Sequence, residues 1–571
     1  MSKSRLMTAP RIFLENAKKM AEKPRFQIKD SQGNWKPILW SEYAEKVEQT
    51  ALWLRSVGVG LNQKVSIFSG TRVEWAYAGI ATQCARGVLV PIYHSNTPPQ
   101  TQYVLEHSDS IVCFTESVFL DHFQKFWDQI PNVKFIVVLD WEDVSQLNHA
   151  QFPNHGVDKQ ILAYGDVLKA GARLHDENNQ AFELLVEEAE DEDPCSIIYT
   201  SGTTGMPKGV VLSNYNVVKN GEDWISVLGS LIPETRVDLL WLPLSHIFGW
   251  GEIGLGNSLG FETYFTNPKD VLPLLQSIKP TVFMSVPAYW EKLFLQAINS
   301  SSIETEQIEK LMEVTGGRLK FCLSGGAGLK KEVKDFYFKA GILLVEGYGL
   351  TEASPTITMN RPDDFNFESV GKPFPSVEVK LGEDGEILAK GPNIFVGYYK
   401  NPEATKDTMT EDGWLKTGDL GEWTSDGFLK IIGRKKDIIV TAGGKNISPQ
   451  LIEAQFLDNQ LIEHIVLYGN EHKYLVAMIT LKQHETQKFA KQAGISTSNH
   501  SELCTEKAIL DFVQKSLEQI NQGLASYETI KKFFILPESL SIEKEFITPS
   551  LKIKRNVIHK AFREQFEALY K

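Results

Sequence analysis

The chain has 571 residues, which is too long for one hydrophobic core and predicts several compact units. Its 42% hydrophobic and 23% charged residues are typical of a globular protein and exclude a disordered one. The net charge of −13 argues against nucleic acid as the main partner, because binding to phosphate backbones needs an excess of lysine and arginine.

The cysteines and apolar segments indicate the cellular compartment of the protein. Five cysteines lie far apart and form no Cys-x-x-Cys pair, so we expect free thiols in a reducing compartment. The longest apolar zone, residues 75–93, is interrupted by Gln83 and Arg86, and no apolar segment follows the charged first residues. We therefore expect a cytoplasmic protein. The sequence leaves peripheral membrane contact and a homodimer open.

Helical and strand-like segments alternate in the first part of the chain. This β-α-β rhythm predicts a mainly parallel sheet covered by helices on both faces, with ligands bound beyond the carboxyl ends of the strands. The predicted helices span 42–57, 73–85 and 98–107, and the predicted strands span 64–68, 87–93, 111–114 and 134–139.

The most informative segment follows an acidic stretch, 187–193, that we expect to be a solvated connection. A buried strand is predicted at 196–199, and a second β-branched run follows Lys208. Glycines let the intervening backbone fold tightly, and its N–H groups, hydroxyls and lysine can face an anion. We predict a phosphate cradle, although such a loop also suits a plain hairpin, and its spacing is not that of a Walker A loop. The cradle residues are Thr200, Ser201, Gly202, Thr203, Thr204, Gly205 and Lys208.

Further strand-like runs end in motifs suited to a ligand. His246 follows one of them, beside aromatic residues and glycines, and suits either a pocket wall or a purely structural role. Tyr348 follows another and could stack on a base, and Glu352 could hold a hard cation through oxygen. The predicted strands span 239–244, 281–286, 319–324 and 342–346.

From Gly371 the pattern changes to short strands and turns, which predicts a small β-rich unit or barrel. Asp419, after a Thr-Gly turn, could accept hydrogen bonds from two ribose hydroxyls. The polar residues 433–437 predict a domain boundary. Strands are predicted at 377–381, 385–390, 423–432, 464–469 and 474–481, and helices at 448–456 and 506–520.

Seven motifs in this order resemble the adenylate-forming, or AMP-binding, superfamily, and specifically its long-chain acyl-CoA synthetases. One departure is Leu551 before Lys552, where many adenylating enzymes have glycine; long-chain acyl-CoA synthetases vary in the same way. The motifs are YTSGTTGMPKG at 199–209, LPLSH at 242–246, SGGA at 324–327, GYGLTE at 347–352, DGWLKTGD at 412–419, GRKKD at 433–437 and TPSLKIKR at 548–555.

The resemblance implies an α/β fold in two domains. The N-terminal AMP-binding domain would span 1–434, with doubly wound sheets and a small β-barrel-like subdomain at about 370–434. A small, mobile α+β domain would span 435–571, with its hinge near Lys436.

The resemblance also implies a magnesium-dependent ligase that uses ATP and coenzyme A. It would activate a long-chain fatty acid to acyl-AMP and pass the acyl group to coenzyme A. The catalytic residues would be Lys552, Thr351, Glu352 and His246, with Glu352 holding Mg²⁺. The remaining assignments are Gly326, Ala327, Gly347 and Tyr348 to adenine, Gly349 to the ATP/AMP site, Asp419 and Arg434 to ribose, Gly443 and Gly444 to the coenzyme A channel, and Trp250 to the acyl pocket.

Two other functions remain open from the sequence. A fatty acyl-AMP ligase would transfer its product to an acyl carrier protein, although the uninterrupted segment 436–443 favours coenzyme A. A non-catalytic lipid-binding homologue would keep the fold without the chemistry, and the intact Lys208, Glu352, Asp419 and Lys552 argue against it.

Overall fold

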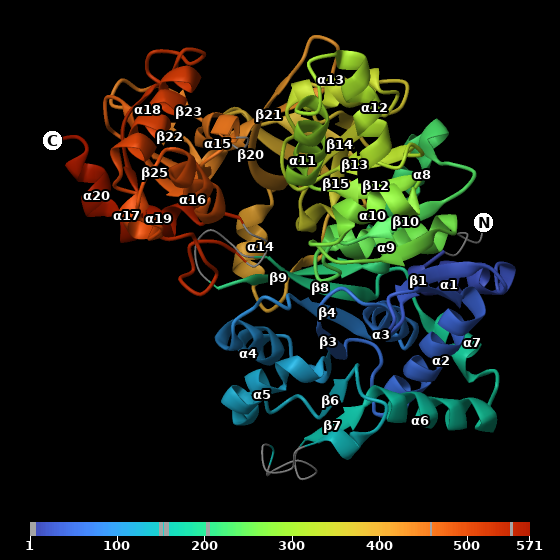
Figure 1. Ribbon diagram of the computed structural model, residues 1–571. Coiled ribbons are helices and arrows are strands. Elements are labelled where there is room, and N and C mark those ends of the chain that lie inside the picture. The colour runs from blue at the N-terminus through green and yellow to red at the C-terminus, as the bar shows by residue number, and fades with distance from the viewer. Residues whose placement is uncertain (1–6, 148–151, 153–158, 201–205, 457–458, 549–551) are drawn as a thin grey trace.

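Two large, mostly parallel sheets form the N-terminal part of the chain, and a smaller α+β part follows (Figure 1). The computed structural model describes residues 7–147, 152, 159–200, 206–456, 459–548 and 552–571. This architecture confirms the predicted α/β fold with a large N-terminal and a smaller C-terminal domain.

The first sheet has eight strands in the order β19-β9-β8-β4-β3-β5-β6-β7. Its inner strands are parallel, as the β-α-β rhythm predicts, whereas β9 runs antiparallel to both β8 and β19. The strands are β3 (Lys64–Phe68), β4 (Val88–Ile92), β5 (Ser110–Thr115), β6 (Phe135–Val138), β7 (Gln160–Ala163), β8 (Pro194–Thr200), β9 (Lys208–Ser213) and β19 (Gly397–Tyr398).

The second sheet has nine strands in the order β16-β15-β14-β13-β12-β10-β11-β1-β2. The strands from β14 to β1 in this order are parallel, so their carboxyl ends share one edge. The strands are β1 (Pro24–Lys29), β2 (Trp35–Leu39), β10 (Val237–Leu240), β11 (Glu262–Phe265), β12 (Val282–Ser285), β13 (Phe321–Ser324), β14 (Leu344–Gly349), β15 (Thr356–Met359) and β16 (Lys372–Pro373).

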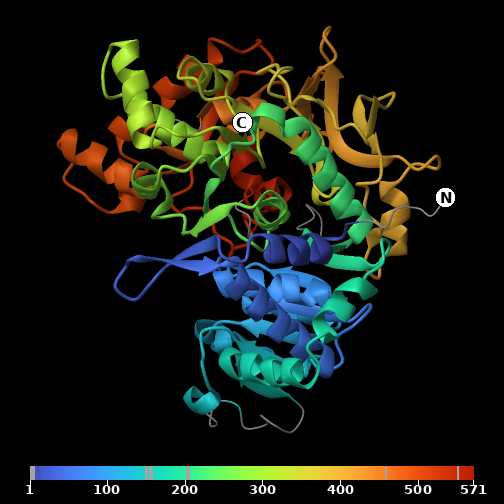
Figure 2. The same cartoon turned by 90° about the vertical axis from the view of Figure 1, so that its right-hand side faces the viewer.

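A layer of helices joins the two sheets through one hydrophobic core. This core combines residues of α1, α2, α3 and α7 with β3 and β5 of the first sheet and β10 of the second. Figure 2 shows the blue helices of this layer between the two sheets. The helices of the N-terminal part are α1 (Ala9–Lys19), α2 (Trp40–Ser56), α3 (Val73–Cys84), α4 (Pro98–His107), α5 (Leu120–Phe126), α6 (Tyr164–Glu177), α7 (Ala181–Glu188), α8 (Asn214–Leu228), α9 (Ile247–Leu259), α10 (Val271–Ile278), α11 (Pro287–Ile298), α12 (Glu304–Val314), α13 (Lys331–Lys339) and α14 (Pro402–Thr408).

The predicted β-rich unit is an antiparallel sheet in the order β17-β18-β20-β21. The single strand predicted at 423–432 is wrong, because Gly427 at φ +80° closes a turn there, with a hydrogen bond from its N–H to the Thr424 carbonyl. The apolar residues on either side of this turn belong to two different strands. The strands are β17 (Glu378–Leu381), β18 (Glu386–Lys390), β20 (Leu415–Trp423) and β21 (Leu429–Arg434).

The C-terminal part is built on the sheet β24-β25-β26, which buries both faces. Alternate residues of β25 enter two separate cores, one against α18 and the other against α19 and α20. The strands are β22 (Ile439–Val440), β23 (Asn446–Ile447), β24 (Ile462–Tyr468), β25 (Leu475–Leu481) and β26 (Ile530–Ile535). The helices are α15 (Pro449–Glu453), α16 (Gln483–Gln492), α17 (His500–Leu503), α18 (Lys507–Asn521), α19 (Arg555–Ala561) and α20 (Arg563–Ala568).

Two other segments differ from expectation. The strand predicted at 239–244 ends at Leu240 as β10, because Pro243 lacks the N–H that a continued strand would use. The acidic stretch 187–193 is more than a solvated connection: Glu188 pairs with Arg55 at 3.0 Å and Asp193 with Arg86 at 2.7 Å. Among the helices that the structure describes, none is long and apolar enough to cross a membrane.

A buried polar cluster fixes α9 against the second sheet. Arg25 is fully buried and donates from Nη1 to the Thr263 hydroxyl at 2.8 Å, which in turn donates to Asp238 Oδ2 at 3.0 Å. The carboxyl groups of Asp238 and Glu252 interact, and burial together with the neighbouring Asp238 raises the pKa of Glu252 well above its ordinary value. Folding therefore favours the neutral form of Glu252.

Replacing Glu252 with glutamine should stabilise the protein at alkaline pH. Above the ordinary pKa of 4.5 the unfolded chain loses this proton while the folded chain keeps it, so stability falls as pH rises. A glutamine amide can donate to Asp238 without that cost. We expect Glu252→Gln to raise the free energy of unfolding by about 1–2 kcal/mol at pH 8 and to give no gain below about pH 4.

Urea unfolding at both pH values measures this difference. Glu262→Gln is the control, because Glu262 accepts a hydrogen bond from Gln27 in a less buried setting. A pH-independent effect of Glu252→Gln would contradict the raised pKa of Glu252.

Candidate active site

The glycine-rich segment joins β8 and β9, whose last and first residues, Thr200 and Lys208, are register partners. It is therefore a hairpin connection, and a hairpin can also serve as a phosphate cradle. Ser201, Gly202, Thr203, Thr204 and Gly205 lie outside the described residues.

Helix α4 holds both ends of this connection. Tyr103 donates its hydroxyl to the Pro207 carbonyl at 2.9 Å, and His107 Nδ1 lies 2.8 Å from the Tyr199 hydroxyl. Neither α4 residue was predicted to act near the site, since nothing in its local spacing marks it.

Glu352 lies in the turn η5 (Thr351–Ala353), directly after β14, and is fixed at two points. Its carbonyl accepts the Phe395 N–H at 2.9 Å, and its Oε1 accepts the Tyr398 hydroxyl at 2.7 Å. The Lys208 ammonium lies 4.7 Å from the centre of the Tyr398 ring. Thr351 begins the same turn, so the structure brings Thr351, Glu352 and Lys208 into one region.

The proposed adenine residues lie at the carboxyl ends of β13 and β14. Buried Glu346 accepts the Leu329 N–H at 3.0 Å and pairs with Lys334 at 2.5 Å, which ties the loop after β13 to β14. Gly326 has φ +85°, and a Cβ on Gly349 would lie 1.8 Å from the Pro355 carbonyl oxygen, so both positions require glycine. The exposed Ala327 completes the first loop, and Gly347 continues the second.

Asp419 is buried and shares its two oxygens between two partners. Tyr348 donates its hydroxyl to Oδ2 at 2.7 Å, and Arg434 Nε lies 2.8 Å from Oδ1. Burial raises the pKa of Asp419, and Arg434 and the Tyr348 hydroxyl oppose that rise. The predicted Thr-Gly turn is instead a bulge within β20, where Gly418 has φ +74° and three residues face one residue of β18.

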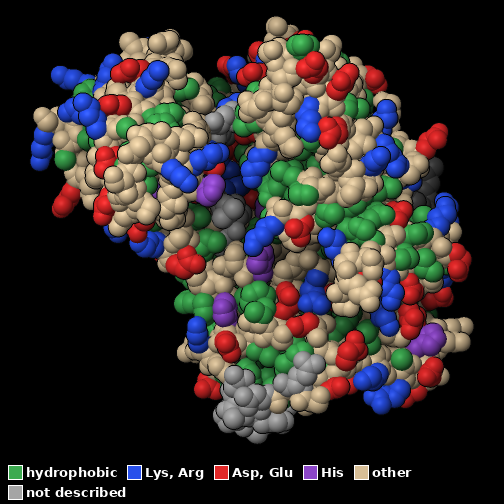
Figure 3. Space-filling model, in the orientation of Figure 1, with side chains coloured by type: hydrophobic (Ala, Val, Ile, Leu, Met, Phe, Trp, Pro, Cys, Tyr) green, Lys and Arg blue, Asp and Glu red, His purple; other side chains and the backbone are tan. Residues whose placement is uncertain are grey.

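Lys552 reaches this group from the C-terminal part. The residue is exposed, but neighbouring atoms partly desolvate its ammonium; this desolvation and Arg434 lower its pKa, and Asp419 and Glu352 oppose that change. The loop that carries it is closed by a hydrogen bond of 2.8 Å from the Thr548 N–H to the Lys552 carbonyl. Figure 3 shows the hollow between the C-terminal lobe and the rest of the molecule.

His246 lies at the start of α9, where its Nδ1 accepts the Phe248 N–H at 3.1 Å. Burial lowers its pKa to about 4, and the positive charge of Lys552 contributes to this change. The imidazole is therefore neutral at pH 7 with its proton on Nε2. His246 thus belongs to the same region as Lys552.

Four other predicted residues occupy different settings. Lys436 is exposed in the turn η6 (Lys435–Asp437), and Gly443 and Gly444 lie in the exposed turn between β22 and β23. Trp250 packs against Trp75 of α3, with ring centres 5.0 Å apart, which is a helix-packing contact. Its assignment to an acyl pocket stays a prediction.

The segment around Lys436 is held on both sides. Lys435 pairs with Asp384 at 2.5 Å and with buried Glu386 at 2.8 Å, both in the N-terminal part. Gln450 of the C-terminal part donates to Asp437 at 2.5 Å. One backbone hydrogen bond, from Ile438 N–H to the Arg434 carbonyl at 3.1 Å, spans Lys436.

These features define an adenylate-forming ligase. Residues 13–399 match the AMP-binding enzymes and residues 436–571 match the AMP-binding enzyme C-terminal domain, so the chain belongs to the AMP-binding enzyme family.

Related proteins include two named ligases and a solved adenylation domain. The chain is 31% identical to the long-chain-fatty-acid–CoA ligase FadD15 of Mycobacterium bovis, over 94% of this chain and 93% of that protein. It is 28% identical to long-chain-fatty-acid–CoA ligase 5 of Rattus norvegicus, over 94% and 84%. Its fold matches the adenylation domain of a carboxylate reductase from Mycobacterium chelonae with a TM-score of 0.82 at 22% identity, over 100% and 92% of the chains.

Membership of this family implies the use of ATP. Among the described residues, no group of three or more His, Cys, Asp or Glu side chains could hold a metal ion. Mg²⁺ at nucleotide sites uses one or two carboxylates together with substrate phosphates. The single carboxylate of Glu352 therefore fits an ion that binds with a triphosphate.

A histidine titration tests the contact between the two parts of the chain. We expect His246 to stay neutral down to about pH 4, and we expect Lys552→Ala to raise its pKa partway toward 6.5 by removing a nearby positive charge. NMR of labelled histidine side chains measures the shift.

His559 provides an internal control for this titration. Its pKa is also lowered to about 4, but by burial and Arg555, so it should not respond to Lys552→Ala. If Lys552→Ala leaves the pKa of His246 unchanged, the electrostatic interaction between the two side chains is contradicted.

Proposed function

We propose that the protein converts a long-chain fatty acid, ATP and coenzyme A to acyl-CoA, AMP and pyrophosphate. The observation that carries the proposal is the position of Lys552, which brings its ammonium from the C-terminal part into the electrostatic range of Asp419, Arg434 and Glu352. The identities to long-chain-fatty-acid–CoA ligases support the choice of substrate.

In the first half-reaction the fatty carboxylate attacks the α-phosphorus of ATP, and pyrophosphate leaves. Two anions must approach each other, so catalysis depends on fixed positive charge and in-line geometry. Lys552 would lie between the carboxylate and the α-phosphate, where negative charge builds up. Asp419 and Arg434 would hold the ribose, and neutral His246 would line the acyl side without adding charge.

The leaving pyrophosphate would be held by the β8–β9 hairpin. Lys208 supplies positive charge at the end of this hairpin, and Thr351 supplies a hydroxyl from the opposite sheet. Glu352 would hold Mg²⁺, which when bound neutralises phosphate charge. Gly326, Ala327, Gly347, Tyr348 and Gly349 would surround the adenine.

In the second half-reaction the thiol of coenzyme A attacks the acyl-adenylate and releases AMP. We propose two domains, 1–434 and 435–571, that rotate about Lys436 between the half-reactions. The rotation would withdraw Lys552 and bring Gly443 and Gly444 to the pantetheine channel, where small residues leave room. The cytoplasmic location, peripheral membrane contact and a homodimer stay predictions.

A pyrophosphate-release assay with acids from C2 to C20, with and without coenzyme A, tests the function. We expect release to increase with chain length, because each buried methylene contributes about 0.8 kcal/mol. Lys552→Ala should lower acid-dependent ATP–pyrophosphate exchange by about 10²–10³-fold and largely spare thioester formation from supplied acyl-adenylate.

Three outcomes would contradict parts of this proposal. Equal loss of both half-reactions in Lys552→Ala would remove the assigned role of the lysine. Transfer to an acyl carrier protein instead of coenzyme A would identify a fatty acyl-AMP ligase. No release with any acid would indicate a non-catalytic lipid-binding protein.

A bulky residue at Gly443 should separate the two half-reactions. We expect Gly443→Leu to leave pyrophosphate exchange unchanged and to slow transfer to coenzyme A, because the side chain would obstruct the channel only after the domain has rotated. Leu451→Ala, on an exposed position of the same domain, is the control. Unaffected transfer in Gly443→Leu would exclude the channel assignment.

A further inference from the structure

We infer that Tyr398 is a positioning residue that sets both the Glu352 carboxylate and the Lys208 ammonium for a metal–triphosphate ligand. This inference rests on the proposed function, because it assumes that the ligand is ATP with a divalent cation. It adds to that function a residue outside the seven motifs.

The hydroxyl of Tyr398 fixes one oxygen of Glu352. Oε1 accepts this hydroxyl at 2.7 Å, and the main chain of Glu352 is held three residues earlier by the Phe395 N–H. The segment 395–398 therefore fixes both the backbone and the side chain of Glu352. With Oε1 occupied, the carboxylate plane is set and Oε2 remains for a cation, as in other sites where an outer residue orients a ligating group.

The ring of Tyr398 forms the second contact. The Lys208 ammonium lies over this ring, 4.7 Å from its centre, within the range of a cation–π interaction. Lysine has a long, flexible stem, and a ring beneath its ammonium restricts where that charge lies. Tyr398 thus contacts both the Lys208 ammonium of the hairpin and the Glu352 carboxylate of η5.

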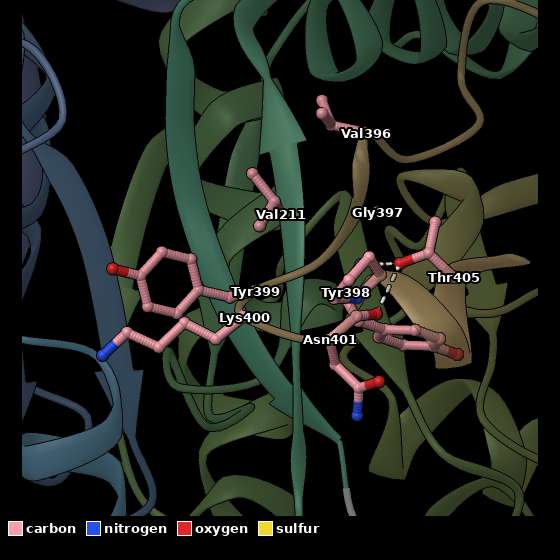
Figure 4. A pocket seen from close by; sticks show the side chains of 9 residues that line it. Val211, Val396, Gly397, Tyr398, Tyr399, Lys400, Asn401 and Thr405 are labelled. Atoms are coloured by element: carbon pink, nitrogen blue, oxygen red, sulfur yellow. Dashed lines mark hydrogen bonds between the residues drawn. The ribbon is translucent and has the colours of Figure 1, made fainter.

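Tyr398 is itself rigidly placed. It pairs with Val210 in β9, its N–H donates to the Thr405 hydroxyl of α14 at 2.8 Å, and its ring packs edge-on against Phe395, with centres 4.9 Å apart. Figure 4 shows Tyr398 and Thr405 on one side of a surface hollow of about 450 Å³, with Tyr399 directed the other way.

Tyr399 provides a matched control one residue away. Its hydroxyl donates to Asp109 at 2.8 Å, far from Glu352 along the chain and on the opposite side of β19. Loss of the Tyr399 hydroxyl removes a hydrogen bond of the same kind, at the residue that follows β19, without touching Glu352 or Lys208.

The experiment measures metal and nucleotide binding without turnover. Mn²⁺ serves as the probe, and its binding in the presence of ATP, with no fatty acid or coenzyme A, is followed by electron paramagnetic resonance of the free ion. We expect Tyr398→Phe to weaken Mn²⁺ binding about tenfold, because the ring stays but the hydroxyl that orients Glu352 is lost. Tyr398→Leu should also weaken ATP binding measured in EDTA, because Lys208 loses the ring.

Tyr399→Phe should bind Mn²⁺ and ATP like the unaltered protein, and thermal unfolding should show all variants folded. Wild-type binding by Tyr398→Phe, or an equal loss in Tyr399→Phe, would overturn the inference while the pyrophosphate assay still supports the proposed function. If Tyr398→Phe weakens Mn²⁺ binding but the unaltered protein releases no pyrophosphate with any acid, the inference is supported and the proposed function is excluded. An unaltered protein that binds no Mn²⁺ with ATP would overturn both.

Discussion

The buried carboxylate of Asp419 is the charge on which the arrangement of the cleft depends. An unpaired carboxylate in this position would carry a large desolvation cost, so its two oxygens must be satisfied. Tyr348 and Arg434 do so from two different strands, which requires the bulge at Gly418 and the register of β20 with β21. The same charge attracts Lys552 of the C-terminal part.

The charges of the molecule are distributed unevenly. The chain as a whole carries −13, yet Lys208, Arg434 and Lys552 lie around the region proposed for two anionic substrates. In a partly desolvated cleft such fixed cations act more strongly than in water, because the dielectric constant is lower there. The net negative charge of the chain disfavours nonspecific binding of other polyanions.

Much of the fold could be predicted from residue patterns. The strand at 64–68 and the helix at 98–107 match the structure to the residue, since Pro98 marks the first turn of that helix and apolar residues define the strand. The hairpin around Gly427 was missed because the apolar residues before and after its turn were taken as one continuous strand.

The site was predicted less evenly than the fold. The motif residues could be named because each lies in a recognisable local sequence pattern, and several of these patterns follow a strand end. Tyr398 could not, because its partner Glu352 is 46 residues away and only the pairing of β19 with β9 brings them together. The approach of Lys552 to Asp419 likewise depends on how two separately folded parts meet.

The anchoring of the chain on both sides of Lys436 limits how the proposed rotation can occur. Lys435 is held by the N-terminal part and Asp437 by the C-terminal part, so one residue supplies the freedom of movement. A single residue has two soft torsion angles, φ and ψ, and the motion is then a twist about one point rather than the bending of a linker. The backbone hydrogen bond that spans Lys436 is worth about 0.5–1.5 kcal/mol, so its loss would add little to the cost of such a twist.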